Sequence, residues 1–202
     1  DETGPLLAGH VVSRRVVASE RNKQPPAPVV ATTVVSSQLL GHMARRNRWN
    51  YVETLTGFKH LARAADDQPG ELAFAYEEAI GTCPAPQVVA DKDGIATALI
   101  AAQWVADLKE QGRTLLDELA ELEQAYGVFR TGQVSMRFET PEQAAEMVAT
   151  VLHAPPAELA GITVGSSPIE DSAGRTTDGV KLAGQREETA IRVIARPSGT
   201  EP

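Results

Sequence analysis

Apolar and polar residues follow one another along the first two thirds of the chain in blocks that predict helices and strands in turn. Residues 29–35 are β-branched and almost continuously apolar, which is typical of a strand that is buried on both faces. A helix before it, over about residues 3–17, is predicted by residues at helical spacing: Leu6, Leu7, His10 and Val11. The polar, Pro-rich stretch between them, residues 19–28, predicts an exposed loop.

Four further elements are predicted after the first strand. Ser36 and Ser37 offer an N-cap for a helix that continues through Met43 to about Arg46. The pattern then predicts a short strand at 51–54, a helix from the Thr56 turn to about Ala65, a turn at 66–70 and a second central strand at 72–76.

Two amphipathic helices are expected next, each from its own apolar stripe. The first stripe consists of Ile95, Leu99, Ala102, Val105 and Leu108, and the second of Leu115, Leu116, Leu119 and Leu122. The alternation of strands and helices up to this point implies a layered α/β domain with a largely parallel or mixed sheet.

The pattern changes at Gly127. Residues 128–138 predict an extended segment, and Thr140, Pro141 and Gln143 mark a helix start at the N-cap, N1 and N3 positions. This helix is expected to bury Ala144, Met147, Val148, Val151 and Leu152, and short strands are expected at 162–164, 179–182 and 189–195. The predicted fold is therefore an α/β domain with a mixed sheet, residues 1–127, followed by a smaller α+β domain, residues 128–202.

The charge balance argues against nucleic-acid and membrane-surface binding. The 202 residues contain 19 Lys and Arg against 27 Asp and Glu, which gives a formal net charge of −8. Proteins that bind nucleic acid or acidic membranes normally carry a basic stripe. A local basic cluster at 45–48 lies at the end of a predicted helix, where cations complement the helix dipole.

Cysteine usage and the chain ends give two further expectations. Cys83 is the only cysteine, so no intrachain disulfide can form and a reducing, cytoplasmic setting is expected. No apolar run approaches the roughly 20 residues that span a bilayer. The chain begins at Asp1 without an initiator Met and stops at Pro202 within a motif, so we expect both ends to be cuts inside a longer protein.

The last seven residues, 196–202, read Arg-Pro-Ser-Gly-Thr-Glu-Pro and suit a phosphate. The guanidinium of Arg196 presents a planar fork of donors, and the hydroxyls of Ser198 and Thr200 add neutral ones. Gly199 has no Cβ, so its backbone N–H can approach an anion closely. The alternative interpretation is an ordinary turn, because Gly, Pro and Ser dominate turns for conformational reasons.

Two adjacent carboxylates, Glu77 and Glu78, follow the strand predicted at 72–76. Open α/β sheets usually bind ligands at the carboxyl ends of their strands, and two acidic acceptors can hold vicinal sugar hydroxyls. Loop solvation explains such a pair equally well.

Two other turns have the same kind of chemistry. Asp93 is a suitable N-cap for the helix that follows, and Lys92 beside that helix start would add positive potential for an anion. Thr56 and Gly57 form another strand-to-helix turn, with a hydroxyl and a flexible glycine.

The order and spacing of these motifs resemble a known family. Thr-Gly-Phe-Lys at 56–59 is followed by Glu-Glu-Ala-Ile-Gly at 77–81, Asp-Lys-Asp-Gly at 91–94 and the heptapeptide at 196–202. Together they resemble the third and fourth domains of the α-D-phosphohexomutase superfamily, the phosphoglucomutases and phosphomannomutases. Asp1 and Glu2 look like the end of the Gly-Asp-Glu turn that starts the third domain. The stretch 76–95 is similar to the phosphoglucomutase/phosphopentomutase branch.

The resemblance implies a role for each motif. Arg196, Ser198, Gly199 and Thr200 would hold the non-reacting phosphate of a phosphosugar. Glu77, with Glu78 beside it, would accept hydrogen bonds from sugar hydroxyls, Lys92 would face the phosphoryl group or position the sugar, and Thr56 and Gly57 would line the same cleft. Many members have Ser where this chain has Ala79, so the resemblance does not indicate whether glucose, mannose or a pentose is preferred.

The resemblance also implies partners outside the chain. Family enzymes carry a phosphoserine in domain one and an Asp-rich Mg²⁺ loop in domain two, and neither motif occurs here. The expectation is a fragment of an isomerase that acts with its missing N-terminal domains, Mg²⁺ and a glucose 1,6-bisphosphate-type activator, and that is inactive by itself. The alternatives are a stand-alone, non-catalytic phosphosugar-binding module, and an unrelated Rossmann-like domain, for which the Gly-rich fingerprint is missing.

Overall fold

The computed structural model describes residues 1–19 and 26–197, without the side chains of 15–19. The chain divides into two compact units, Asp1–Thr131 and Gly132–Pro202. The boundary predicted from the sequence was near residue 127. Most of the loop predicted at 19–28 lies outside the described residues.

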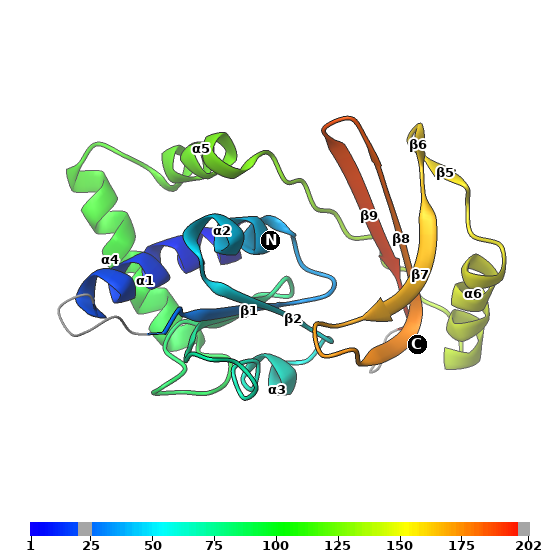
Figure 1. The fold of residues 1–202 in the computed structure, drawn as a ribbon, viewed down its shortest axis with the longest axis horizontal. Helices are drawn as coiled ribbons and strands as arrows, with labels where there is room; N and C mark the ends of the chain where they lie inside the picture. The colour runs from blue at the N-terminus through cyan, green and yellow to red at the C-terminus, as the bar shows by residue number, and fades with distance from the viewer. Residues whose placement is uncertain (20–25, 198–202) are drawn as a thin grey trace. The chain divides into compact units, whose positions relative to one another are not determined.

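The first unit is a four-stranded sheet with helices on both faces, as predicted (Figure 1). The strand order is β2-β1-β3-β4, and only β4 runs antiparallel to its neighbour. In chain order the elements are α1 (Thr3–Ser19), β1 (Val29–Thr33), α2 (Leu39–Asn47), β2 (Asn50–Thr54), α3 (Phe58–Leu61), β3 (Leu72–Glu77), β4 (Gly81–Cys83), α4 (Gly94–Glu110) and α5 (Leu115–Tyr126).

The core of this unit lies on both sides of β1 and β3. Every residue of β1 is buried, which confirms the prediction from its continuous apolar run. Val30 and Phe74 belong to a cluster with buried residues of α1, α2 and α4, whereas Ala31 and Ala75 belong to a second cluster with α3. Both faces of the sheet are therefore covered, and the turns at its carboxyl edge are anchored to a buried core.

The helix after β1 begins later than predicted. It starts at Leu39, with Gln38 at the N-cap position and no side-chain cap bond from that residue. The hydroxyl of Ser37 nevertheless accepts a hydrogen bond from the backbone N–H of Leu39 at 3.1 Å. Ser37 therefore accepts from a backbone N–H of the first helical turn, although it lies one position before the N-cap.

The predicted helix after Thr56 is much shorter than expected. Only the four residues of α3 are helical, and turns occupy 62–67. Phe58 and Leu61 are both buried in this one turn, so it already covers its face of the sheet.

The predicted apolar stripe of α4 is only partly right. Leu108 is buried as predicted, together with Trp104, but Ile95 and Leu99 are 87% and 70% exposed. Both faces of this helix are apolar, so periodicity alone cannot tell which one faces inward. The large indole of Trp104 decides it, since its ring stacks on His10 of α1 at 4.5 Å between centroids.

The basic cluster at 45–48 lies at the C-terminal end of α2, as predicted. It also reaches the end of α5. The guanidinium of Arg46 donates to the backbone carbonyl of Ala125 and lies 5.6 Å from the centroid of the Tyr126 ring. Arg46 thus lies in the last turn of α2 and also contacts the end of α5.

The second unit is a smaller α+β structure, as predicted. Helix α6 (Pro141–His153) precedes β5 (Glu158–Leu159), β6 (Ile162–Thr163), β7 (Gly165–Glu170), β8 (Thr176–Arg186) and β9 (Thr189–Ala195). The last three strands form an antiparallel sheet in the order β7-β8-β9. The hydroxyl of Thr140 accepts from the N–H of Gln143 at 3.4 Å, which confirms the predicted helix start.

The apolar face of α6 is less buried than predicted. None of its residues is fully buried, and Met147 and Leu152 are about half exposed, at 45% and 48%. Val151 packs against a small cluster of buried residues that includes Val180 and Leu182 of β8. The three-stranded sheet thus offers the helix only a narrow surface.

Segment 128–138 contains no strand.

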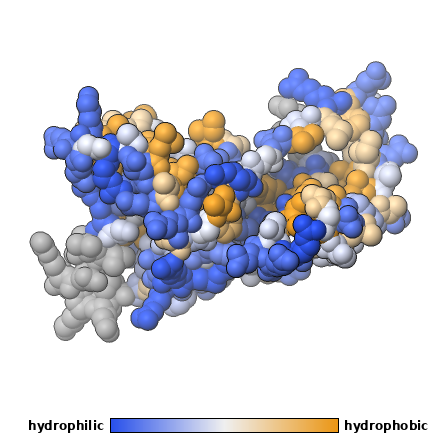
Figure 2. Space-filling view, turned by 90° about the horizontal axis from the view of Figure 1, so that it is seen from above, coloured by the Kyte–Doolittle hydropathy of each residue, from blue (hydrophilic) through white to orange (hydrophobic). Residues whose placement is uncertain are grey.

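In the view of Figure 2, hydrophilic side chains cover much of the face, and hydrophobic side chains gather in several patches among them.

Replacement of Gly4 by Ala tests how closely α1 packs on the sheet. A Cβ at Gly4 would lie 2.4 to 2.6 Å from carbons of the Tyr76 ring, which is itself 1% exposed. We expect Gly4→Ala to lower the free energy of unfolding by about 1–3 kcal/mol, the usual cost of overpacking. The control is Gly94→Ala, where a Cβ meets no atom within 4 Å. Equal urea midpoints for wild type and Gly4→Ala would contradict this packing.

Asp171 makes the stability of the second unit depend on pH. Its carboxylate accepts from the backbone N–H groups of Ala173 and Arg175 and from the Arg175 guanidinium, at 2.8–3.0 Å. Burial alone would raise the pKa of Asp171, but these hydrogen bonds outweigh it and the pKa lies below its usual range.

A lowered carboxyl pKa stabilises the fold above the unfolded value of about 3.9, and the gain is lost as the pH falls through the folded value. We therefore expect Asp171→Asn to cost about 1–3 kcal/mol at pH 7 and progressively less below about pH 4. Urea unfolding at several pH values measures this difference, and a cost independent of pH would contradict the assignment.

Candidate active site

The predicted site residues of the first unit lie at one edge of its sheet. Strands β1, β2 and β3 are parallel, so their carboxyl ends meet there. Thr56 and Gly57 follow β2, Glu77 ends β3, and Glu78 comes directly after it. Parallel sheets bind ligands at this edge, because the loops that leave it converge.

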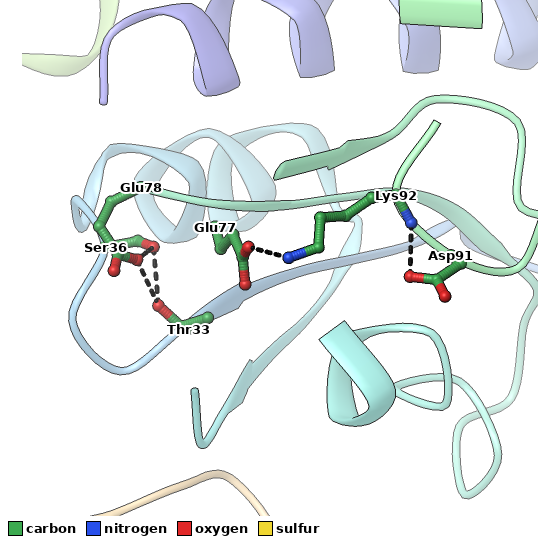
Figure 3. Close-up of polar contacts among 6 residues, drawn as sticks. All are labelled: Thr33, Ser36, Glu77, Glu78, Asp91 and Lys92. Atoms are coloured by element: carbon green, nitrogen blue, oxygen red, sulfur yellow. Dashed lines mark hydrogen bonds and ion pairs between the residues drawn. The ribbon is translucent and has the colours of Figure 1, made fainter. Parts of the chain in front are cut away.

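Glu77 and Lys92 form the centre of this edge (Figure 3). The Lys92 ammonium donates to Oε1 of Glu77 at 2.7 Å. The Glu77 side chain is only 11% exposed, whereas that of Lys92 is 53% exposed. The carboxylate is thus fixed, and the ammonium keeps access to solvent and to an anionic ligand.

Lys92 joins three of the sequence motifs. Its Nζ lies 5.6 Å from the centroid of the Phe58 ring, which follows Thr56 and Gly57. Gly57 has φ 114°, and it occupies the N-cap position of α3. The motifs at 56–59, 77–81 and 91–94 are therefore contiguous in space, as their shared role in the predicted site requires.

Glu78 has a different environment from its neighbour. Its Oε2 accepts hydrogen bonds from the hydroxyls of Thr33 and Ser36, each at 2.9 Å (Figure 3). Thr33 and Ser36 are buried, and they lie at and after the carboxyl end of β1. Glu78 therefore ties the turn after β3 to the turn after β1. That it also contacts a sugar stays a prediction.

The sequence reasoning missed Thr33 and Ser36. Thr33 at the end of β1 and Ser36 shortly after it were a signal, because a buried hydroxyl needs a partner. That partner comes from 42 and 45 residues away, which a single sequence cannot reveal.

The turn that carries the acidic residues is a tight hairpin. Glu77 pairs with Gly81 across β3 and β4, which leaves residues 78–80 as the turn. A Cβ at Gly81 would lie 2.7 Å from Oε1 and 2.8 Å from Cγ of Glu77. Glycine at this position thus makes room for the side chain that holds Lys92.

The loop before α4 is fixed at both of its aspartates. Asp91 accepts from the backbone N–H of Lys92 at 2.7 Å, and Asp93 caps α4 by accepting from the N–H of Ala96 at 2.8 Å. The predicted N-cap is therefore confirmed. The backbone N–H of Asp93 also donates to the carbonyl of Thr82 in β4.

The predicted phosphate grip is described only at its first residue. Arg196 follows β9 and is exposed, and Ser198, Gly199 and Thr200 lie outside the described residues. Gly179 of β8, with φ 131°, lies against the strand end. A Cβ there would come within 2.5 Å of the Ala195 carbonyl and 2.9 Å of the Cβ of Arg196. The role of Arg196 in binding phosphate stays a prediction.

Within residues 1–19 and 26–197, no three His, Cys, Asp or Glu side chains are arranged to hold a metal ion. None of the helices in these ranges has the length and apolarity that crossing a membrane requires.

Comparison with known proteins gives consistent matches. Residues 7–126 match the family model for phosphoglucomutase/phosphomannomutase, alpha/beta/alpha domain III. A Haemophilus influenzae protein named "Probable phosphomannomutase" is 35% identical over 173 residues, which are 86% of this chain and 34% of that protein. A Staphylococcus aureus (strain N315) phosphoglucomutase is 32% identical, over 84% of this chain and 33% of that enzyme.

A solved structure has the same fold. The open form of pp63/parafusin, a phosphoglucomutase from Paramecium, aligns with a TM-score of 0.58 at 19% identity, over 98% of this chain and 34% of its own. The chain thus spans about a third of the length of the relatives it matches.

Replacing each of the two adjacent glutamates tests their different environments. We expect Glu78→Ala to cost about 1–2 kcal/mol of unfolding free energy, because the Thr33 and Ser36 hydroxyls lose a shared acceptor. Glu77→Ala removes only an ion pair with a half-exposed lysine, which contributes about 0–1 kcal/mol. Urea unfolding compares the two variants, and a larger loss for Glu77→Ala would contradict these assignments.

Proposed function

Because this chain belongs to the phosphoglucomutase/phosphomannomutase family, we propose that it is the sugar- and phosphate-binding part of a phosphosugar mutase. The full enzyme is an isomerase that moves a phosphoryl group between C1 and C6 of a hexose phosphate, or C5 of a pentose phosphate. A phosphoserine outside this chain gives its phosphoryl group to the free sugar hydroxyl, and the other phosphate of the resulting bisphosphate returns to the serine. The enzyme acts in the cytoplasm.

One observation carries this proposal. Glu77 is fixed at the carboxyl edge of the sheet, and a cation that remains half exposed lies within 2.7 Å of its carboxylate. A carboxylate accepts hydrogen bonds from sugar hydroxyls, and an accessible ammonium attracts a phosphate. The pair therefore places a hydrogen-bond acceptor for sugar hydroxyls next to a cation that attracts a phosphate.

Positioning is what the chain contributes to the reaction. Phosphoryl transfer depends mainly on alignment and charge stabilisation, so a fixed sugar site and a fixed phosphate site suffice. Glu77 orients the ring through its hydroxyls, Glu78 holds the turn, Thr56 and Gly57 line the cleft, and Lys92 faces the phosphoryl group. Arg196, with Ser198, Gly199 and Thr200, holds the phosphate that does not react.

The metal and the activator belong to the rest of the enzyme. Mg²⁺ supplies charge neutralisation to the transferring phosphoryl group when it is bound. The described residues do not fit such a site, since they contain no suitable group of metal-ligating side chains. We assign Mg²⁺ and the reactive serine to other domains of the proposed enzyme, because neither the phosphoserine motif nor the Asp-rich loop of the family occurs in this sequence. A glucose 1,6-bisphosphate-type activator would supply the first phosphoryl group.

The alternative is a stand-alone binding module without chemistry. We prefer the mutase because the relatives are named as mutases and the match covers only 34% and 33% of their length. Both proposals require that the 202 residues bind phosphosugars, and that the chain by itself does not interconvert them.

Binding measurements on the 202-residue chain test the proposed roles. Titration calorimetry with glucose 1,6-bisphosphate and with inorganic phosphate separates sugar from phosphate recognition. We expect Glu77→Gln to weaken the bisphosphate by about 1.5–3 kcal/mol, since it loses a charge-assisted acceptor, and not to weaken inorganic phosphate. We expect Arg196→Ala to weaken both ligands by about 2–4 kcal/mol.

Two results would contradict the proposal. One is a chain that binds no phosphosugar, and the other is a Glu77→Gln variant that binds glucose 1,6-bisphosphate as wild type does. Mutase turnover by the isolated chain would contradict the assignment of the reactive serine to another domain.

A further inference from the structure

The hairpin turn that follows Glu77 contains an unusual residue. Ile80 is the last residue of the three-residue turn 78–80 and has φ 63°. Three-residue hairpins commonly need a left-handed residue at this position, and glycine normally supplies it. A β-branched side chain in this conformation is strained, because its Cβ approaches the neighbouring carbonyl oxygen.

The fold gains nothing from this side chain in return. Ile80 is 97% exposed, so it buries almost no apolar surface. Four non-glycine residues with positive φ are described, namely Arg48, Ile80, Ala160 and Glu187, and the other three are polar or small. A strained residue that is not compensated by packing indicates a role outside folding.

The position of Ile80 indicates what that role is. The turn is held at its start, by Glu77 bound to Lys92 and by Glu78 bound to Thr33 and Ser36. At its end, Gly81 pairs with Glu77 across β3 and β4. An exposed apolar side chain therefore lies three residues from the carboxylate assigned to sugar hydroxyls. A sugar ring presents C–H groups as well as hydroxyls, and an aliphatic side chain covers C–H groups by removing them from water.

We propose that Ile80 is a specificity-determining residue that contacts the apolar C–H surface of the bound sugar. This inference rests on the proposed function. The left-handed turn places the isoleucine at the rim of the site, where it selects ligands with a sugar ring over a bare phosphate. The conformational strain at this residue is retained because glycine, which the turn itself would favour, has no side chain to contact the ring.

Ile80→Gly tests this directly in the 202-residue chain. We expect the melting temperature to rise, because glycine relieves the strain, and the Kd for glucose 1,6-bisphosphate to increase at least fivefold. The Kd for inorganic phosphate should not change. Ile80→Val keeps a β-branched apolar side chain and should retain affinity for the bisphosphate within about twofold.

Arg48→Gly is the matched control. Arg48 has φ 58° and follows α2, at the amino end of β2 and thus at the opposite edge of the same sheet. At about 0.15 M salt, where distant charges are screened, it should raise the melting temperature without changing either Kd. A gain in stability that always reduces binding would appear in this variant as well.

The outcomes separate this inference from the proposed function. If wild type binds glucose 1,6-bisphosphate and Ile80→Gly binds it equally well, Ile80 has no role in specificity. A melting temperature that falls in Ile80→Gly would also overturn the inference, because the side chain would then serve the fold. If wild type binds no phosphosugar, the proposed function fails and this inference fails with it.

Discussion

Parallel pairing of β1 with both β2 and β3 is the constraint on which the site depends. It brings three strand ends to one edge, so residues as far apart in sequence as Thr33 and Glu78, 45 positions, become neighbours. The hydrogen bonds of Glu78 to Thr33 and Ser36 then join two of these ends directly. Glu77, the residue before Glu78, is consequently held in place, and the Lys92 ammonium donates to its carboxylate. A site with fixed acceptors loses little ordering entropy when a ligand binds.

Electrostatics give this edge its significance in an acidic chain. A net charge of −8 disfavours the approach of anions in general, so a phosphosugar requires local cations. Lys92 is one of these cations. Its side chain is half exposed and forms an ion pair with Glu77. In the proposed enzyme, Arg196 is the other. We propose that these cations attract phosphate groups and that Glu77 accepts hydrogen bonds from the sugar hydroxyls.

Much of the fold could be predicted because its signals are local. The continuous apolar run of β1 indicated a doubly covered strand, and Thr140 and Asp93 indicated helix starts that the structure confirms. The failures came where the deciding contact is distant. The inner face of α4 is set by Trp104 on His10, and the partners of Glu78 lie on another strand. The positive φ of Ile80 follows from the register of β3 with β4. Motif spacing identified Glu77 and Lys92, but only the structure shows that they touch.

The central claim is that the carboxyl edge of this sheet binds a phosphosugar through a preformed acidic turn. Backbone NMR of the 202-residue chain, titrated with glucose 1,6-bisphosphate, tests it most directly. We expect the largest shift changes in the first unit at residues 77–81 and 92, and little change at the opposite edge around residues 48–50. Changes confined to that opposite edge, or none in the first unit at saturating ligand, would contradict the account.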